Sequence, residues 1–310
     1  MGRISYIYIL LLTVPMFWGT SYGAAKIGMR ELAPLNMAML RIIMAAIIFG
    51  CILLAMKRNN TIERRDIPRF IFLGFMAITS FFYIHFTGLQ YTTSANAGLI
   101  MATTPVFAAL FCSALGREKN TILGAVGIII AFCGVSIIIT KGQFVGLFRY
   151  ETLRGDGLIL VNALVWAGFT LYGTTILEKY RPFVAMAYIH IFGAMLFLPF
   201  AIFPNPFVTV TLIEQLAYIS KETITAAIYL AAFCSVYSYY MWYTGIEKLG
   251  AVRTVVFNYF NPVFAVLTGV FLLGETFTMH VLFGGVMIIL GVYMTNRRQE
   301  DPLRQRNINK

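Results

Sequence analysis

Apolar segments of similar length follow one another along almost the whole chain, and polar residues are confined to the stretches between them. Ten such segments can be delimited, at residues 4–24, 34–55, 70–88, 95–114, 121–140, 157–176, 183–203, 223–243, 251–272 and 278–296. Each is close to the ~20 residues with which an α-helix crosses the apolar core of a bilayer. The alternation over ~10 residues that marks a membrane β-strand does not occur. The pattern therefore predicts an all-α polytopic membrane protein with ten transmembrane helices.

The second half of the chain repeats the first. Residues 88–135 match residues 245–292 at a constant offset of 157 without a gap, and both copies contain the run Pro-Val-Phe-Ala. Upstream of this block, an offset of 148 pairs Trp18 with Trp166. Matches of this length and regularity indicate two homologous units of the same fold.

The matches divide the chain into two five-helix repeats, residues 1–140 and 155–296, followed by a polar and basic tail at 297–310 that is expected to be disordered. Because five is an odd number, the second repeat begins on the opposite side of the membrane from the first. We therefore expect inverted repeats related by a pseudo-two-fold axis in the membrane plane, an arrangement that places substrate between the halves in transporters. The first segment has a counterpart in the second repeat, which favours a retained helix over a cleaved signal peptide.

Composition agrees with a membrane protein. Hydrophobic residues make up 59% of the 310 residues and charged residues 12%, whereas a soluble domain carries about a quarter charged residues. The net charge of +11 would suggest nucleic acid as a partner if the basic residues were clustered on a soluble chain. Placing the N-terminus in the cytoplasm instead puts 17 Lys and Arg residues inside and six outside. By the positive-inside rule this bias predicts cytoplasmic termini and no nucleic-acid partner.

Motifs that would indicate an enzyme, a metal centre or a bound cofactor are missing from the sequence. It contains no Gly-rich phosphate loop after a strand, no HExxH helix and no nucleophile elbow. The four cysteines fall in apolar segments without metal-ligand spacing, and their positions are Cys51, Cys112, Cys133 and Cys234. We therefore expect no catalytic residue, no metal and no cofactor.

Both repeats carry sequences of a known kind. The run TTPVFAALFCSALGREKNTILGAVGIIIAFCGVSII and its counterpart NPVFAVLTGVFLLGETFTMHVLFGGVMIILGV resemble the ending of an EamA-type repeat. The opening FWGTSYGAAKIG, followed by Pro34 and MLRIIMAA around Arg41, fits the same pattern. The chain thus resembles the EamA branch of the drug/metabolite transporter superfamily over nearly its whole length. The second repeat departs from the first, since no Arg stands where Arg41 would map and His190 lies nearby.

This resemblance implies ten helices in two inverted halves. It also implies a transporter of amino acids and other small metabolites, often an exporter, in the bacterial inner membrane. The cavity of the family is walled mainly by helices 1, 3, 4, 6, 8 and 9. The resemblance specifies the fold more closely than the substrate.

A pair of prolines recurs near the middle of the fourth and ninth apolar segments. Pro105 and Pro262 lack an N–H and should each free the carbonyl four residues earlier, at Met101 and Asn258. A free carbonyl in the membrane has to face protein or a watery cavity. We expect two kinked helices that line the transport path, although a proline tolerated in a packed helix is the alternative.

Polar residues near these prolines differ between the halves. Asn258 and Asn261 share a helix face with Pro262, where the first repeat has Met101 and Thr104. Amides in the middle of a membrane need hydrogen-bond partners. These can be polar groups of a substrate or groups on neighbouring helices.

Aromatic residues also recur at equivalent positions, with Trp18 matching Trp166 and Tyr83 matching Tyr240. Trp and Tyr near helix ends commonly form an interfacial belt, but symmetric positions on helices that meet between the halves favour a cavity lining. Such a lining suits a substrate with an apolar part or a cation. The predicted substrate-binding residues are Trp18, Tyr83, Met101, Thr104, Trp166, Tyr240, Asn258 and Asn261.

The 13 acidic residues all fall in loops or at helix ends, so no carboxylate is expected in mid-membrane to carry protons. This leaves facilitated diffusion, or coupling through His85 or His190. Arg41 lies about six residues into its helix. It can reach the outer surface by extending its side chain, or meet an anionic group of the substrate. Glu275, which matches Glu118, is expected to cap the helix that follows it near Thr278.

Taken with the resemblance, these patterns predict an inner-membrane exporter of small organic metabolites such as amino acids, which works by alternating access. The alternatives are a proton-coupled drug/metabolite antiporter and a non-transporting membrane scaffold. A membrane enzyme is disfavoured because the chain lacks clustered carboxylates, histidines or metal spacing. The expected partners are the lipid bilayer and a small-molecule substrate.

Overall fold

A computed structural model gives the fold. It describes residues 2–56, 60–114, 122–140, 152–177, 179–203, 210–249, 254 and 256–296. The tail predicted at 297–310 lies outside these residues, as does Glu118. All regular structure in the described part is helical. Seven helices are long and apolar enough to cross a membrane, and three more are shorter and apolar, at Ile122–Ile138, Asn261–Leu273 and Met279–Met294. The prediction of an all-α polytopic protein with about ten helices is confirmed.

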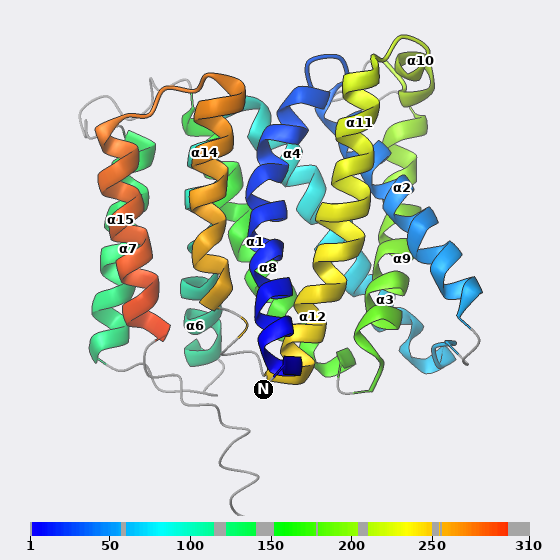
Figure 1. Ribbon diagram of the computed structural model, residues 1–310, viewed down its shortest axis with the longest axis horizontal. Helices are drawn as coiled ribbons and strands as arrows, with labels where there is room; N and C mark the ends of the chain where they lie inside the picture. Colours follow the sequence, from blue (N-terminus) through cyan, green and yellow to red (C-terminus); the bar gives the residue numbers. More distant parts are fainter. Residues whose placement is uncertain are drawn as a thin grey trace, which may run out of the picture.

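The first half runs through five membrane crossings (Figure 1). They are formed by α1 (Gly2–Gly28), α2 (Pro34–Ala55), the chain of α3 (Ile67–Gly74), η2 (Phe75–Ser80) and α4 (Phe81–Tyr91), the pair α5 (Ser94–Met101) and α6 (Thr104–Ala114), and α7 (Ile122–Thr140). The second half repeats this order. Its crossings are α8 (Leu153–Leu177), α9 (Pro182–Ile202), the chain of α11 (Lys221–Tyr229), η4 (Leu230–Tyr237) and α12 (Ser238–Leu249), the pair η5 (Val256–Phe260) and α14 (Asn261–Leu273), and α15 (Met279–Asn296).

The two halves are inverted, as contacts at one end of the bundle show. Lys26, near the end of α1, forms an ion pair with Glu275, which also accepts a hydrogen bond from the backbone N–H of Ser94. Asp156, in the first turn of α8, accepts hydrogen bonds from Thr92 and Asn96 beside Ser94. Helix α1 therefore ends where α8 begins, so equivalent helices run in opposite directions. We call this end the distal face and the end that holds the N-terminus the proximal face; they lie at the top and bottom of Figure 1.

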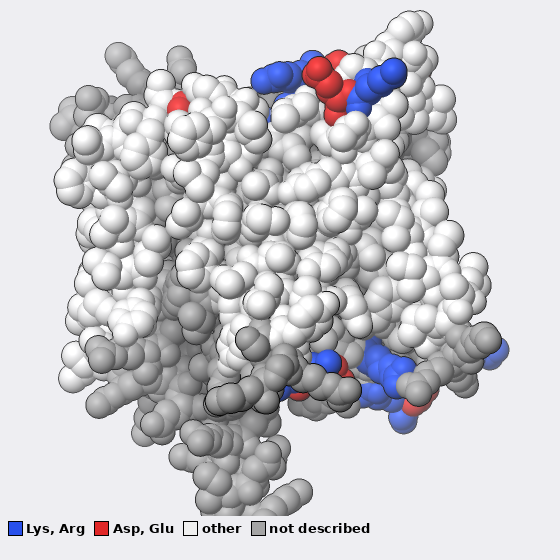
Figure 2. All heavy atoms as spheres, in the orientation of Figure 1, with Lys and Arg blue, Asp and Glu red and all other residues white. Residues whose placement is uncertain are grey.

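An apolar belt separates the two faces. Figure 2 shows that Lys, Arg, Asp and Glu gather at the two ends of the visible side, with a broad band of other residues between them. Large apolar side chains are exposed on the surface of the helices, among them Phe271, which is 79% exposed. Such a surface is stable only in lipid. The protein is a multi-pass membrane protein.

Glycines allow α7 and α15 to pack against each other at one edge of the bundle (left in Figure 1). A Cβ atom at Gly134 would lie 2.6 Å from the carbonyl oxygen of Gly284, and a Cβ at Gly284 would lie 2.7 Å from that of Gly134. Backbones approach this closely in membranes only where side chains are very small. Gly284 and Gly127 are paired by the repeat, as are Gly291 and Gly134, so the repetition of glycine has a packing cause.

Two π-helical segments occupy equivalent places in the repeats. They are η2 (Phe75–Ser80) and η4 (Leu230–Tyr237). Their last residues, Ser80 and Tyr237, are equivalent at the offset of 157 that relates the repeats. A π segment disturbs the regular hydrogen-bond ladder and rotates the residues after it, and such segments are frequent at functional sites. Neither segment contains a proline or glycine that would predict it from the sequence.

The two repeated prolines stand at the start of new helices rather than in the middle of continuous ones. Pro105 is the second residue of α6 and Pro262 the second residue of α14. There the missing N–H costs little, because the first N–H groups of a helix have no partner within it. The carbonyl of Met101, expected to be free, accepts a hydrogen bond of 2.7 Å from the hydroxyl of Thr104.

Glu275 caps a helix of the other half, which corrects the expectation that it caps the following helix. Gly274 takes a left-handed conformation (φ 65°) and ends α14, which turns Glu275 back toward the bundle. Its carboxylate accepts hydrogen bonds from the N–H groups of Ser94 (2.8 Å) and Ala95 (3.2 Å) at the start of α5. The helix after it is capped instead by the hydroxyl of Thr278.

Substituting Glu275→Gln is expected to lower stability by about 1–2 kcal/mol, because a negative charge at a partly buried helix start and its ion pair with Lys26 are both lost. Thermal unfolding of the purified protein in detergent measures this. Glu222→Gln is the matched control, since Glu222 also lies in the first turn of a helix but is exposed. Equal melting temperatures for Glu275→Gln and the wild type would contradict the assignment.

The distal segment 210–222 is tied to α2. Residues 210–222 include the short helix α10 (Leu212–Leu216), whose Gln215 accepts hydrogen bonds from the backbone N–H of Ala33 (3.0 Å) and the amide of Asn36 (2.7 Å). Glu31 accepts a further bond of 2.8 Å from the N–H of Ser220, and this bond lowers the pKa of the Glu31 carboxyl. These contacts hold the distal loop against the bundle.

On the proximal face a charged cluster joins the end of α8 to the segment before α3. Lys179 lies 2.5 Å from Asp66 and 2.7 Å from Glu63, and the hydroxyl of Tyr180 donates to Asp66. Hydrogen bonds to the two carboxylates raise the pKa of Lys179 to about 12. Lys179 therefore stays charged at all physiological pH values.

Candidate functional site

An aromatic cluster lies where the two halves meet. The ring of Trp18 on α1 lies 6.5 Å from that of Trp166 on α8, its equivalent in the other repeat. Tyr239 on α12 contacts both, at 5.7 Å from Trp18 and 5.8 Å from Trp166. Trp242 lies 5.2 Å from Trp18. The structure thus brings together the symmetric Trp pair that the sequence singled out, and adds two rings from the eighth crossing.

The π segment η4 holds Trp18 in place. The indole Nε1 donates a hydrogen bond of 3.0 Å to the carbonyl of Cys234 within η4. In a regular α-helix the N–H of Ser238 would bond to that carbonyl, but here it donates to the carbonyls of Phe233 and Ser235. The altered ladder leaves the Cys234 carbonyl for the indole. The backbone irregularity thus orients the aromatic ring.

His85 stands on the far side of Trp166. Phe81 contacts Trp166 at 5.0 Å and stacks on His85 at 5.3 Å. The Nδ1 atom of His85 lies 3.2 Å from the amide nitrogen of Asn162, and that amide also approaches the sulfur of Met101 at 3.9 Å. Asn162, on α8, is fully buried and links three crossings, although the sequence pattern did not point to it.

Arg41, on α2, is buried near the aromatic cluster, with 5% of its surface exposed. Its Nε donates a hydrogen bond of 3.0 Å to the hydroxyl of Ser235 in η4. Its guanidinium lies 4.6 Å from the centroid of the Phe82 ring, within the range of a cation–π contact. Of the two alternatives left by the sequence, extension to the outer surface does not occur.

Tyr83 and Tyr240 are not brought to the cluster. The ring of Tyr83 contacts Phe200 at 5.6 Å and that of Tyr240 contacts Phe183 at 5.6 Å, both on α9. Neighbouring positions on a helix point about 100° apart, so Tyr239 and not Tyr240 faces the Trp pair. The π segments before both tyrosines add a rotation that a regular helical repeat does not predict.

Asn258 and Asn261 offer unused acceptors. Their side-chain Oδ1 atoms are buried and have no hydrogen-bond partner among the described residues, and the same holds for Oδ1 of Asn162. Asn261 packs against α1 beside Trp18, because a Cβ atom at Gly19 would lie 2.6 Å from the backbone carbonyl oxygen of Asn261. Buried amide oxygens are rarely left without a donor, so these atoms mark places where a ligand or water can donate.

His190 lies on the opposite flank of the cluster. It is 1% exposed, and its ring lies 5.0 Å from that of Tyr239. Its Nδ1 is paired with the carbonyl of Met186 at 2.9 Å, while Nε2 has no partner among the described residues. In the described part of the chain no three His, Cys, Asp or Glu side chains form a group that could hold a metal ion.

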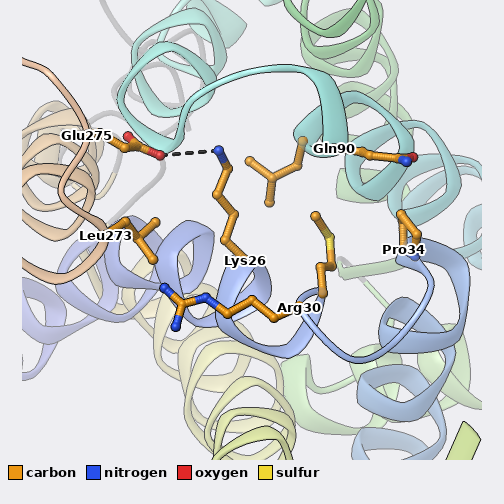
Figure 3. Close-up of a pocket in the computed structure, with 8 residues that line it drawn as sticks. Lys26, Arg30, Pro34, Gln90, Leu273 and Glu275 are labelled. Carbon is orange, nitrogen blue, oxygen red and sulfur yellow. Dashed lines mark ion pairs between the residues drawn. The ribbon is translucent and has the colours of Figure 1, made fainter.

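A polar pocket opens on the distal face, away from the aromatic cluster. It has a volume of about 360 Å³, and Figure 3 shows Lys26 reaching across it to Glu275, with an ion-pair distance of 3.2 Å. Arg30 and Gln90 project from its other sides. Its lining consists of Lys26, Met29, Arg30, Pro34, Leu89, Gln90, Leu273 and Glu275. The ion pair ties α1 to the end of α14 at this face.

The sequence matches the profile of the EamA-like transporter family twice, over residues 5–140 and 153–297. The chain belongs to this family. It is therefore a membrane transporter built of two EamA domains, and not an enzyme, as the sequence predicted.

Relatives of full length support the same assignment. Two proteins of Archaeoglobus fulgidus, each named an uncharacterized transporter, are 28% and 30% identical to this chain; each alignment covers 94% of it and 98% of the relative. A protein of Salmonella typhimurium named a probable amino-acid metabolite efflux pump is 26% identical, with 92% of this chain and 93% of that protein covered.

One solved crystal structure has the same fold. It aligns with a TM-score of 0.66 over 99% of both chains, at 17% sequence identity. At this identity the likeness shows the fold alone.

Proposed function

We propose that this EamA transporter exports small organic metabolites such as amino acids across the bacterial inner membrane by alternating access. The observation that carries the proposal is the contact of Trp18 with Trp166, two equivalent residues, at the junction of the inverted halves. In transporters of this plan the substrate lies between the repeats, near the middle of the membrane. The name of the Salmonella typhimurium relative supports amino acids as the substrate class.

The chemistry of the cluster suits an amphipathic solute. The rings of Trp18, Trp166 and Tyr239 offer apolar faces that also attract an ammonium group. The free amide oxygens of Asn162 and Asn261 can accept hydrogen bonds from a donor of the solute. We place both termini in the cytoplasm because 17 Lys and Arg residues then lie inside and six outside.

We further propose a uniporter driven by the solute gradient. The acidic residues that the structure describes lie in loops and at helix ends, and buried Asp156 belongs to the first turn of α8 at the distal face. Within this described part no mid-membrane carboxylate is available for proton transfer. His85 is the alternative proton carrier. It is buried, stacks on Phe81 and lies within hydrogen-bond distance of Asn162.

Transport assays in proteoliposomes test the function and its energy source together. Uptake and efflux of a metabolite library, amino acids included, are measured with and without an imposed pH gradient. We expect movement down the solute gradient and no accumulation of a neutral or zwitterionic solute beyond equal concentrations. Accumulation against the solute gradient that His85→Gln abolishes would establish proton coupling instead. If no solute of the library moved, the proposed function would be wrong.

A further inference from the structure

Arg41 carries a buried positive charge without a counter-ion among the described residues. Its guanidinium is always charged and has five N–H donors. Its one hydrogen bond in the described part of the chain is that from Nε to Ser235, and no carboxylate there lies within ion-pair distance. A charge buried in this way is costly unless something neutralises it for at least part of the working cycle.

The contacts of Arg41 leave one edge of the guanidinium unused. Ser235 occupies the Nε donor, and the Phe82 ring covers a face of the planar group at 4.6 Å. The two terminal nitrogens make no hydrogen bond to a described residue. Parallel N–H groups at the edge of a guanidinium match the two oxygens of a carboxylate, with which arginine forms bidentate pairs. The protein thus fixes the orientation of the Arg41 guanidinium and leaves its terminal N–H groups available to bind an anion.

The surroundings connect this edge to the aromatic cluster. Arg41 lies over the Phe82 ring, Phe82 contacts Phe81 with ring centroids 5.1 Å apart, and Phe81 contacts Trp166 at 5.0 Å. An anion held by Arg41 therefore has apolar ring surface beside it. Among the described residues, no acidic side chain that would attract a cation lies in this region. The ion pairs of the described structure lie at the two faces of the bundle instead.

We infer that Arg41 binds the carboxylate of the transported solute, and that this carboxylate is the group the site requires. The inference rests on the proposed function and narrows its substrate class to organic acids and amino acids with an apolar body. An ammonium group is tolerated, through ring faces and free amide oxygens, but is not sufficient. Organic amines that lack a carboxylate are rejected, because the charge of Arg41 repels them and stays unpaired.

Matched sets of compounds test this requirement. An isobutyl, a benzyl and an indolylmethyl body are each presented as the amino acid, as the corresponding carboxylic acid and as the corresponding amine. Binding to the full-length protein in lipid nanodiscs is followed by tryptophan fluorescence, and transport of the same compounds is measured in proteoliposomes. We expect the amino acids and the acids to bind about tenfold or more tightly than the amines, the ratio that one charge-assisted hydrogen-bond pair provides.

Variants at Arg41 assign the preference to this side chain. Arg41→Gln should remove the difference between acids and amines, and Arg41→Lys should keep part of it, because lysine retains the charge but not the bidentate edge. Arg154→Gln is the matched control and should behave as the wild type: Arg154 is exposed and also lies 4.6 Å from an aromatic ring, that of Tyr91. Size-exclusion profiles and melting temperatures report whether each variant is folded.

The outcomes separate the inference from the function. Binding and transport of amines equal to those of the acids would overturn the role of Arg41 while the transporter function stands. A folded Arg41→Gln protein that preserves the preference for acids would also overturn this role. So would a folded Arg41→Lys protein that loses the preference entirely. Absence of binding and transport for every compound of the panel would count against both.

Discussion

Trp166→Ala is expected to lower the transport rate at least about tenfold, while the amount of protein in the membrane stays near that of the wild type. Trp166 contacts Trp18, Tyr239 and Phe81, so its removal takes away an indole ring that bridges the two halves. Loss of an aromatic contact of this size in a binding site costs about 2 kcal/mol or more, which exceeds a tenfold change. The initial rate of solute exchange in proteoliposomes, normalised to reconstituted protein, measures the effect.

Tyr172→Ala provides the control on the same helix. Tyr172 is 42% exposed and its ring contacts Phe72, 5.4 Å away, on the surface of the bundle. The same kind of truncation there should leave the exchange rate within about twofold of the wild type, as is usual for exposed positions. Wild-type exchange in Trp166→Ala would show that the aromatic cluster is a packing feature and not the binding site.

Gly193→Leu is expected to abolish folding of most of the protein. A Cβ at Gly193 would lie 2.8 Å from the carbonyl oxygen of Gly74, and it would also collide with Ile78. A side chain cannot enter this crossing of α3 and α9 unless the two helices separate. Forcing bulk into packed helices costs about 1–3 kcal/mol, and separated helices lose further packing that holds them together in lipid. The yield of monodisperse protein in size-exclusion chromatography, with the melting temperature of any folded fraction, tests this.

Gly50→Leu is the control for the chemical change itself. Gly50 also lies inside a membrane helix, but apart from its chain neighbours and the backbone of its own helix no atom lies within 4 Å of a Cβ placed there. This variant should therefore fold with a yield near that of the wild type, because a leucine at that position meets open space and lipid. Comparable loss of protein in both variants would mean that the helical glycines act through something other than this close crossing.

The chain's own pattern determined the architecture. Segments of about 20 apolar residues can only be helices in a bilayer, since every backbone polar group must be bonded within its own segment. The repeat at an offset of 157, together with an odd number of helices per half, then required an inverted arrangement. The matches at an offset of 148 likewise required Trp18 and Trp166 to occupy equivalent places, and the structure shows that they meet. These conclusions depend on local physics and on counting.

The partners of individual side chains were decided by the tertiary structure alone. The π segments η2 and η4 carry no proline or glycine inside them, yet η4 provides the carbonyl that holds Trp18 and the hydroxyl that holds Arg41. They also rotate the residues that follow, which places Tyr239 at the cluster and Tyr240 on its flank. A regular helical repeat cannot reveal a rotation that packing between helices stabilises.

Long-range pairing was equally invisible in the sequence. Glu275 was expected to cap the next helix, but it reaches the start of α5, 181 positions away along the chain, because Gly274 turns it toward the other half. Asn162 and Asp156 found their partners, His85 and Thr92, on α4 and at its end. Sequence alone determined which segments cross the membrane and how the halves are related. The tertiary structure decided which polar atoms face one another, because such pairs form between helices whose rotation and spacing depend on the whole bundle.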